Sequence, residues 1–462
     1  MTRFSGFEDL LRTQAARQPK RPALRCCGEN DLPETITYGA LYQMVKSRRD
    51  QLILKGCRSL GILCDGSPEC VLTALAGPLS GIQIVMLDGN APEELLRSQI
   101  RYTDIDCLWG DEDLVDELND ALCAPVPSGL SRSNERLFAP SSGNILFFTS
   151  GTTGACKAVV LTDSSLMSSA WNGSCMLPLR REDSLLCVLP LNHVFGFVCS
   201  LLWGLQCGAC VCLGRGMRHI TADPAFFRPT AVSLVPALLG FLLKQNTLNP
   251  ELATILVGAG ECPLPLLEAA RAKGIHVSFG YGMTETSSGV AISVAGDPYA
   301  LSLCPDVQIE LSSDNEILIS ANSCMMQGYY KYGDETLKVL QNGILATGDL
   351  GRFDEDGRLH IIGRKKEILV LQDGTKIFLP EYEERIRLIL GDCDFAVLER
   401  DHTPVLVMHD RSEKLTRSRV LEALSPLMKE YPRGQQLRDV LFLAAPLPRT
   451  ATGKVQRYLI HV

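Results

Sequence analysis

The chain has 462 residues, of which 46% are hydrophobic and 21% charged, and its formal net charge is −8 at pH 7. This length predicts two or more domains. The acidic balance argues against general nucleic-acid binding, because there is no basic excess to displace counterions from phosphates. The longest apolar stretches are interrupted by Gly, Gln or Pro, and the amino terminus lacks the apolar core of a signal peptide, so we expect a cytoplasmic protein without membrane insertion.

The chain contains 18 cysteines, but a chain of this size does not depend on a disulfide framework. Cys207, Cys210 and Cys212 form the one metal-like cluster, and they lie in an apolar run without a second pair or a histidine at ligand spacing. We therefore expect a buried strand at this position, and free, mostly buried thiols elsewhere. The seven scattered histidines predict no zinc site.

Helices alternate with apolar strands in the first third of the chain. Thr37 is a suitable N-cap for one helix, and Gly56 lies just beyond its expected end. Helices between apolar strands imply parallel pairing in a layered α/β sheet. The predicted elements are a helix over about 38–54, a strand over 60–64, a helix over 68–79 and a strand over 82–87.

An apolar strand over 145–148 then leads into a loop of small and hydroxyl residues that a lysine closes. Glycines let backbone N–H groups crowd against an anion, and hydroxyls and a lysine add donors and charge, so this loop is typical of phosphate binding. A β-branched segment over 158–162 follows, which predicts a strand–loop–strand clasp and not the usual P-loop. A Thr/Gly-rich hairpin turn is the alternative. The clasp consists of Thr149, Ser150, Gly151, Thr152, Thr153, Gly154 and Lys157.

The middle third repeats the alternation of helices and apolar strands. It begins with a helix that is capped by Thr162 or Asp163 and runs through Trp171. Two of its strands are expected to end in glycine turns, at Gly258–Gly260 and Gly280–Gly282. Ligands of open α/β sheets bind at the carboxyl ends of strands, so both turns should face one crevice. The predicted buried strands are 231–235, 254–257 and 277–279, with Pro236 and Pro263 opening the helices between them.

The final third changes to short strands with hairpin turns, such as 350–353 and 358–362 around a turn at 354–357. A helix over 380–390 follows, with glutamates in its first turn and Gly391 at its end. We place a domain boundary near Lys366, which predicts an N-terminal domain over 1–365 and a C-terminal domain over 366–462.

Three further segments accompany the clasp: Tyr281-Gly-Met-Thr-Glu285, Thr347-Gly-Asp349 with Gly363-Arg-Lys-Lys-Glu367, and Pro448-Arg-Thr-Ala-Thr-Gly-Lys454. In this order the four motifs resemble the adenylate-forming (AMP-binding) superfamily of acyl- and aryl-CoA synthetases, peptide-synthetase adenylation domains and luciferases. The resemblance extends from about residue 36 to Lys454. It implies a large N-terminal domain of layered α/β sheets with a small β-rich subdomain, followed by a small mobile α+β C-terminal domain.

The resemblance also implies a reaction. The enzyme would join a carboxylate to the α-phosphorus of ATP with Mg²⁺ present, release pyrophosphate, and pass the acyl group to the thiol of CoA. Thr284 would then contact the α-phosphate and Glu285 would hold Mg²⁺, although helix-start capping is the alternative for Glu285. The residues implied to bind ATP or AMP are Thr149, Ser150, Gly151, Thr152, Thr153, Gly154, Lys157, Gly280, Tyr281, Gly282, Thr284, Asp349, Arg364 and Lys454.

Asp349 and Arg364 occupy the ribose-binding positions of the family, and Lys366 falls at its hinge. An ordinary surface ion pair is the alternative for Asp349 and Arg364. Lys454 would neutralise charge in the transition state as a catalytic residue, together with Thr284, Glu285 and His193. A solvated lysine near the end of the chain is its alternative.

His193 lies in a Pro-Leu-Asn-His segment similar to the one that gates the carboxylate pocket of acyl- and aryl-CoA synthetases, although a satisfied core histidine is the alternative. No charge follows it that could pair an amino group, so we expect a fatty or aromatic acid and not an amino acid. The residues implied to line the acyl pocket are His193, Phe195, Gly196, Gly258, Ala259, Gly260 and Gly282.

The sequence departs from the family pattern at Cys156, where proline is usual, and over 371–380, which leaves the thiol acceptor open. One alternative function is therefore a ligase that loads the phosphopantetheine of a carrier protein. Basic residues of the small domain would then bind an acidic helix of the carrier, although an ordinary solvated charged face also explains these residues. Another is a catalytically silent nucleotide-binding protein. The basic residues are Arg411, Lys414, Arg417 and Arg419.

Overall fold

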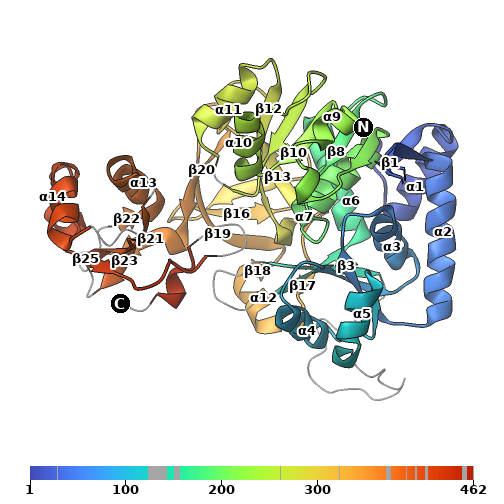
Figure 1. The fold of residues 1–462 in the computed structure, drawn as a ribbon, viewed down its shortest axis with the longest axis horizontal. Helices are drawn as coiled ribbons and strands as arrows, with labels where there is room; N and C mark the ends of the chain where they lie inside the picture. The colour runs from blue at the N-terminus through green and yellow to red at the C-terminus, as the bar shows by residue number, and fades with distance from the viewer. Residues whose placement is uncertain are drawn as a thin grey trace.

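The computed structural model consists of a large part that extends through β20 and a small part, formed by α13, α14 and β21–β25, that lies to one side of it (Figure 1). This agrees with the predicted fold class of layered α/β sheets followed by a small α+β domain. The structure describes residues 1–28, 30–122, 143–149, 157–260, 262–321, 323–370, 376–391, 393–400, 403–410, 415–449 and 455–460.

One sheet of the large part has six strands in the order β17-β7-β6-β4-β3-β5. Strands β3 to β6 pair in parallel, as expected, whereas β7 runs antiparallel to β6 and β17. Alternate residues of β4 face opposite sides: Val85 and Leu87 pack with α4, and Ile84 and Met86 join the main core. The strands are β3 (Ser59–Cys64), β4 (Gln83–Asp88), β5 (Cys107–Trp109), β6 (Asn144–Phe148), β7 (Ala158–Thr162) and β17 (Gly328–Tyr329).

A second sheet has nine strands in the order β14-β13-β12-β11-β10-β8-β9-β1-β2. Its central strands are parallel, and the strands at both edges are antiparallel. The strands are β1 (Pro22–Cys27), β2 (Pro33–Thr37), β8 (Ser184–Cys187), β9 (Cys210–Leu213), β10 (Ala231–Leu234), β11 (Thr254–Val257), β12 (His276–Met283), β13 (Ser288–Ile292) and β14 (Ser302–Leu303).

Local capping explains where the helices of the large part begin and end. The Thr37 hydroxyl accepts the Ala40 N–H at the start of α2, and Gly56 ends that helix in the left-handed region, as predicted. A capping box at Thr162 starts α6, which continues past Trp171. The helices are α1 (Phe7–Arg17), α2 (Tyr38–Lys55), α3 (Pro68–Leu79), α4 (Glu93–Tyr102), α5 (Glu112–Leu118), α6 (Asp163–Met176), α7 (Val194–Gly196), α8 (Trp203–Cys207), α9 (Asp223–Phe227), α10 (Pro236–Gln245) and α11 (Leu264–Arg271).

The predicted glycine turn at Gly280–Gly282 was wrong. Strand β12 continues to Met283 and pairs with β13 in an antiparallel ladder. A Cβ at Gly282 would overlap the carbonyl oxygen of Ser288, so this glycine serves the close approach of two strands and not a change of chain direction. The other predicted turn is present, because Ala259 has a φ of 60°.

The β-rich subdomain is a five-stranded antiparallel sheet in the order β15-β16-β19-β18, with β20 paired to β19. The predicted hairpin around 354–357 joins β19 to β20, and Asp354 Oδ1 accepts the backbone N–H groups of Asp356 and Arg358. The elements are β15 (Gln308–Leu311), β16 (Glu316–Ser320), α12 (Gly333–Val339), β18 (Leu340–Gln341), β19 (Ile344–Phe353) and β20 (Leu359–Arg364).

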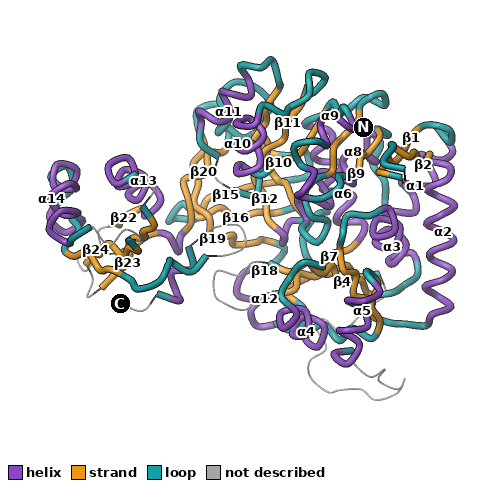
Figure 2. Tube along the Cα trace, viewed as in Figure 1, coloured by secondary structure: helices purple, strands orange, loops and turns teal. Residues whose placement is uncertain are grey.

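The small part has its own apolar core, which includes Tyr382, Phe395 and Leu424, and its strands lie apart from the large sheets (Figure 2). At its junction with the large part, the Phe378 ring packs so closely on Gly363 that a Cβ there would overlap it. The elements are β21 (Ile368–Val370), β22 (Lys376–Phe378), α13 (Leu379–Leu390), β23 (Asp394–Arg400), β24 (Thr403–His409), α14 (Arg417–Met428) and β25 (Asp439–Phe442). The exact domain boundary stays a prediction.

The sixteen cysteines of the described part are free thiols, and most are buried, as expected. The expectation of one strand across Cys207–Cys212 was wrong in part, because Cys207 ends α8, Gly208 caps it in the left-handed region, and the strand begins at Cys210. In the part of the chain that the structure describes, no helix is long and apolar enough to cross a membrane.

Candidate active site

The frame of the predicted clasp is present as β6 and β7, which pair antiparallel with Phe148 opposite Ala158. The Thr149 N–H donates to the Lys157 carbonyl at 2.9 Å and closes the frame. The clasp residues Ser150 to Gly154, and Cys156 after them, lie outside the described residues, so their contact with phosphate stays a prediction.

Lys157 meets two groups that sequence reasoning missed. Its Nζ lies 2.9 Å from Glu335 Oε2 and 4.7 Å from the centroid of the Tyr329 ring. Glu335 also pairs with Lys338, and these two ammonium groups lower the pKa of the Glu335 carboxyl to about 2. No local pattern signals either residue, because both reach Lys157 only through the pairing of β17 with β7.

Glu285 lies at the end of β12, in a short 3₁₀ turn over Thr284–Thr286. Its Oε1 accepts a hydrogen bond of 2.7 Å from the Tyr329 hydroxyl. The carboxylate is half-buried and supplies hard oxygen ligands, so it fits a magnesium ion. Thr284, also half-buried, lies beside it. Tyr329 therefore contacts both Glu285 and Lys157.

Asp349 and Arg364 face each other across the ladder of β19 and β20. Arg364 Nε lies 3.0 Å from Asp349 Oδ1, and the Tyr281 hydroxyl donates to Asp349 Oδ2 at 2.8 Å. Gly348 has a φ of 73°, and the Asp349 N–H donates to the Thr347 hydroxyl, so the Thr-Gly turn points this carboxylate inward. Burial and the Asp349 charge raise the pKa of Tyr281. The structure thus brings the predicted ribose-binding pair against Tyr281, another of the residues predicted to bind the nucleotide.

The residues proposed for the acyl pocket divide into two groups. A Cβ at Gly258 would lie 3.0 Å from the Phe195 ring, so this glycine permits the close approach of the ring. A Cβ at Gly196 would overlap the Pro190 carbonyl, so Gly196, like Gly282, permits close backbone packing and opens no space. Ala259 and Gly260 are exposed on the turn after β11.

His193 precedes the short helix α7 and reaches solvent on one side. The protein around the rest of the ring lowers the pKa of His193, and the charge of Asp88 partly opposes this effect. The imidazole is therefore neutral at pH 7, which suits a residue that contacts a substrate without adding a positive charge. The gating role stays a prediction.

The segments that carry the predicted hinge and the predicted catalytic lysine each have contacts at their flanks. Lys365 Nζ lies 2.6 Å from Asp314 Oδ2 and 3.0 Å from Glu316 Oε2. Arg449 and Val455 form a β-bridge on either side of Lys454. The side chain of Lys366, and Lys454 itself, lie outside the described residues, as do Arg411 and Lys414.

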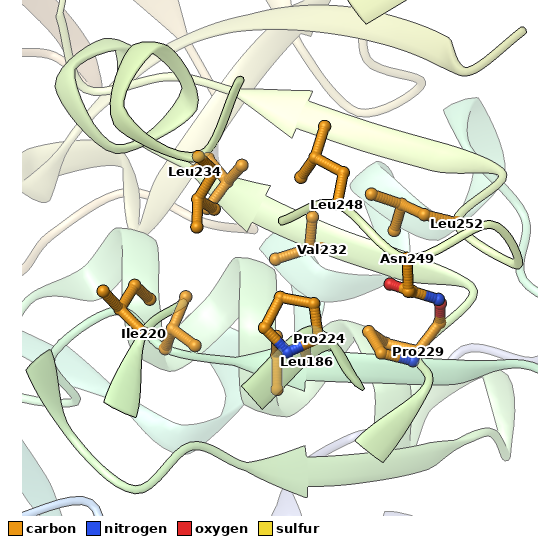
Figure 3. A pocket seen from close by; sticks show the side chains of 11 residues that line it. Leu186, Ile220, Pro224, Pro229, Val232, Leu234, Leu248, Asn249 and Leu252 are labelled. Atoms are coloured by element: carbon orange, nitrogen blue, oxygen red, sulfur yellow. The ribbon is translucent and has the colours of Figure 1, made fainter. Parts of the chain in front are cut away.

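Two other features of the described residues offer little chemistry. The pocket in Figure 3 lies among apolar side chains between α9 and β10, and its volume of about 10 Å³ has room for one water. Asn249 is the one polar side chain of its lining. Cys57, Asp106 and Cys107 lie within 4.8 Å of one another, but the Asp106 carboxylate already accepts the N–H groups of neighbouring backbone.

The sequence profile of a family described as AMP-binding enzyme matches residues 11–330, more than half of the chain. The chain belongs to this AMP-binding enzyme family. The membership confirms the resemblance that the four motifs predicted, and it confirms that the chain is an AMP-binding enzyme.

Curated relatives of this AMP-binding enzyme include the 2-succinylbenzoate–CoA ligase of Bacillus cytotoxicus, 28% identical over 459 residues that cover 87% of this chain and 91% of the relative. A ligase of the same name from Bacillus cereus is 29% identical over 443 residues, with the same coverage. These are names of CoA ligases for an aromatic acid, and they lend no support to a fatty acid or a carrier protein.

Solved structures confirm the fold. The O-succinylbenzoate coenzyme A synthetase of Bacillus subtilis in complex with AMP superposes with a TM-score of 0.81 at 22% identity, over 98% of this chain and 97% of that chain. An anthranilate CoA ligase in complex with anthranoyl-AMP gives a TM-score of 0.80 at 18% identity, over 99% and 97% of the two chains. The AMP-binding enzyme described here thus has the predicted arrangement of a large N-terminal and a small C-terminal domain.

Proposed function

We propose that the chain is an AMP-forming ligase that activates an aromatic carboxylic acid with ATP and transfers the acyl group to the thiol of CoA. One observation carries the proposal. The end of β12 holds a connected set of contacts in which Tyr281 bonds Asp349 and, four residues later, Glu285 bonds Tyr329 beside Lys157. Groups suited to ribose, magnesium and phosphate therefore lie around one short segment, Tyr281 to Glu285.

In the first half-reaction, an oxygen of the acid attacks the α-phosphorus of ATP, and the bond to the pyrophosphate oxygen breaks. Lys157 would hold the β- and γ-phosphates that leave, and Thr284 would donate to the α-phosphate. Glu285 would hold magnesium, which supplies positive charge to the phosphates when it is bound.

In the second half-reaction, the thiol sulfur attacks the acyl carbon, the bond to the phosphate oxygen of AMP breaks, and the thiol proton is released. Asp349 and Arg364 would hold the ribose throughout, because a carboxylate accepts two hydroxyl hydrogen bonds and a guanidinium donates in a fixed fork. Lys454 would neutralise the charge that builds up during adenylate formation.

The pocket supports an aromatic acid over a long alkyl chain. Phe195 is half-buried beside Gly258, where a flat ring could stack against it. The curated relatives are named as ligases of an aromatic acid, which also favours this class over a fatty acid.

ATP–pyrophosphate exchange tests the proposal, with Mg²⁺ present and no thiol added, across panels of aromatic, fatty and amino acids. We expect exchange with an aromatic acid and none with long-chain fatty acids. Exchange only with fatty or amino acids would overturn the substrate class, and silence across all panels, with no ATP bound, would overturn the enzymatic function.

The acceptor is tested once an acid is found, by offering free CoA and a phosphopantetheine-loaded carrier protein in parallel. We expect thioester formation with free CoA. Transfer to the carrier alone would favour the carrier-loading alternative. Action in the cytoplasm is part of the same proposal, because ATP and CoA are its co-substrates.

A further inference from the structure

Tyr329 contacts the two residues proposed to serve the triphosphate and its metal. The Tyr329 hydroxyl donates to Glu285 Oε1 at 2.7 Å, and the Lys157 ammonium lies 4.7 Å from the centroid of the Tyr329 ring. The residue is only 6% exposed. A cation above the face of a phenol ring is attracted to it, and a hydroxyl bonded to a carboxylate fixes the orientation of that carboxylate.

The backbone around Tyr329 holds this position from several sides. Tyr329 pairs with Val159 of β7, two residues after Lys157, and its N–H donates to the Thr336 hydroxyl at 2.9 Å. Just upstream, the Met326 N–H donates to the Glu285 carbonyl at 2.8 Å. The tyrosine is therefore fixed to the strand that carries the lysine and to the turn that carries the glutamate.

Tyr329 gives Lys157 and Glu285 each a neutral partner, while Glu335 pairs with Lys157 from another side at 2.9 Å. An ammonium has three N–H donors, so capacity for a phosphate oxygen remains.

We propose that Tyr329 is a positioning residue that orients Glu285 for magnesium through its hydroxyl and Lys157 for the terminal phosphates through its ring. This inference rests on the proposed function, because it assigns ATP and magnesium to this site. The hydroxyl and the ring of Tyr329 have separate tasks in this proposal, so each can be removed by its own substitution.

The test is direct binding of ATP to the full chain by titration calorimetry, with Mg²⁺ varied from zero to saturation and neither acid nor thiol present. Tyr329→Phe removes the hydroxyl and keeps the ring. We expect the Mg²⁺ concentration for half-maximal enhancement of ATP binding to rise about 10-fold, as for the loss of a hydrogen bond to a charged group, while ATP affinity without Mg²⁺ is unchanged. Tyr329→Leu should weaken ATP binding even without Mg²⁺.

Tyr330→Phe is the matched control. Tyr330 is the adjacent buried tyrosine, and its hydroxyl bonds Asp104 at 3.0 Å, away from Lys157 and Glu285. This variant should bind ATP and Mg²⁺ as the unchanged protein does. A thermal melt of each variant reports whether a shift reflects loss of folding.

The outcomes distinguish failure of this inference from failure of the proposed function. If the unchanged protein binds no ATP, the proposed function fails and the inference falls with it. If the unchanged protein binds ATP and Tyr329→Phe shows the same Mg²⁺ dependence, only the inference fails. Should Tyr329→Leu not fold, the phenylalanine variant, which keeps the volume of the ring, decides the result.

Discussion

Tyr281 and Asp349 are joined by a hydrogen bond of 2.8 Å, which links the end of β12 to the first part of the β19–β20 hairpin. The Asp349 carboxylate is thereby held between a phenol and the Arg364 guanidinium. Two elements that belong to different sheets are fixed to each other at the point where the nucleotide motifs meet.

Replacement of Tyr281 by Phe should weaken ATP binding. The change removes one hydrogen bond to a buried carboxylate, and we expect the KM for ATP in pyrophosphate exchange to rise about 10-fold. Tyr38→Phe is a control, since it removes the hydroxyl of a buried tyrosine that bonds the Ala209 carbonyl. An equal rise in both variants would show a general effect on folding.

Lys454→Ala should abolish adenylate formation and spare thiolysis of supplied acyl-AMP. The expected loss in the first half-reaction is on the order of 10²–10³, as for removal of one preorganised charge-stabilising group. Separate assays of pyrophosphate exchange and of CoA acylation from acyl-AMP check this. Equal loss in both half-reactions would contradict the assignment.

Gly258→Ala should weaken binding of the acid and leave binding of ATP unchanged. The added Cβ would lie 3.0 Å from the Phe195 ring, so the ring must shift into the proposed acyl space. We expect the KM for the aromatic acid to rise about 10-fold, in the range of overpacking a filled site. Gly240→Ala, which meets Leu266 at ordinary contact distance, is the control. A rise in the KM for ATP instead would place Gly258 at the nucleotide.

His193 should make the fold less stable in acid. Its folded pKa is lowered below the value of about 6.5 expected in the unfolded chain, so the unfolded chain binds more protons as the pH falls. The free energy of unfolding should therefore decline as the pH drops below that value. Urea titrations at pH 5 to 8 should show a shallower decline for His193→Gln. The partial exposure of the ring keeps the effect small, and identical slopes would refute it.

Sequence reasoning located the elements with clear end signals. The helix over 68–79 has the predicted bounds and begins with a proline in its first turn, and in the structure the Ser67 hydroxyl also accepts the Cys70 N–H. The strand over 254–257 also matches, because it is short, apolar and followed by a true turn. Local chemistry decides such elements, so the sequence contains what is needed to find them.

The remaining features depend on distant segments. Gly280 and Gly282 suggest a turn in sequence, but the neighbouring strand β13 makes them part of a ladder. Tyr329 and Glu335 lie more than 150 residues after Lys157, with no local pattern that marks them. Only the pairing of β17 with β7 brings them together, and a pairing between distant strands cannot be read from one segment.

The two ion pairs of Lys365 bear on the order in which products leave. They fasten the last residue before the proposed hinge to the β-rich subdomain, so a rotation about Lys366 would begin beyond them. Asp349 and Arg364 lie on the fixed side of that pivot. AMP would keep its ribose contacts while the small domain turns, and pyrophosphate would depart early whereas AMP would be among the last products to be released.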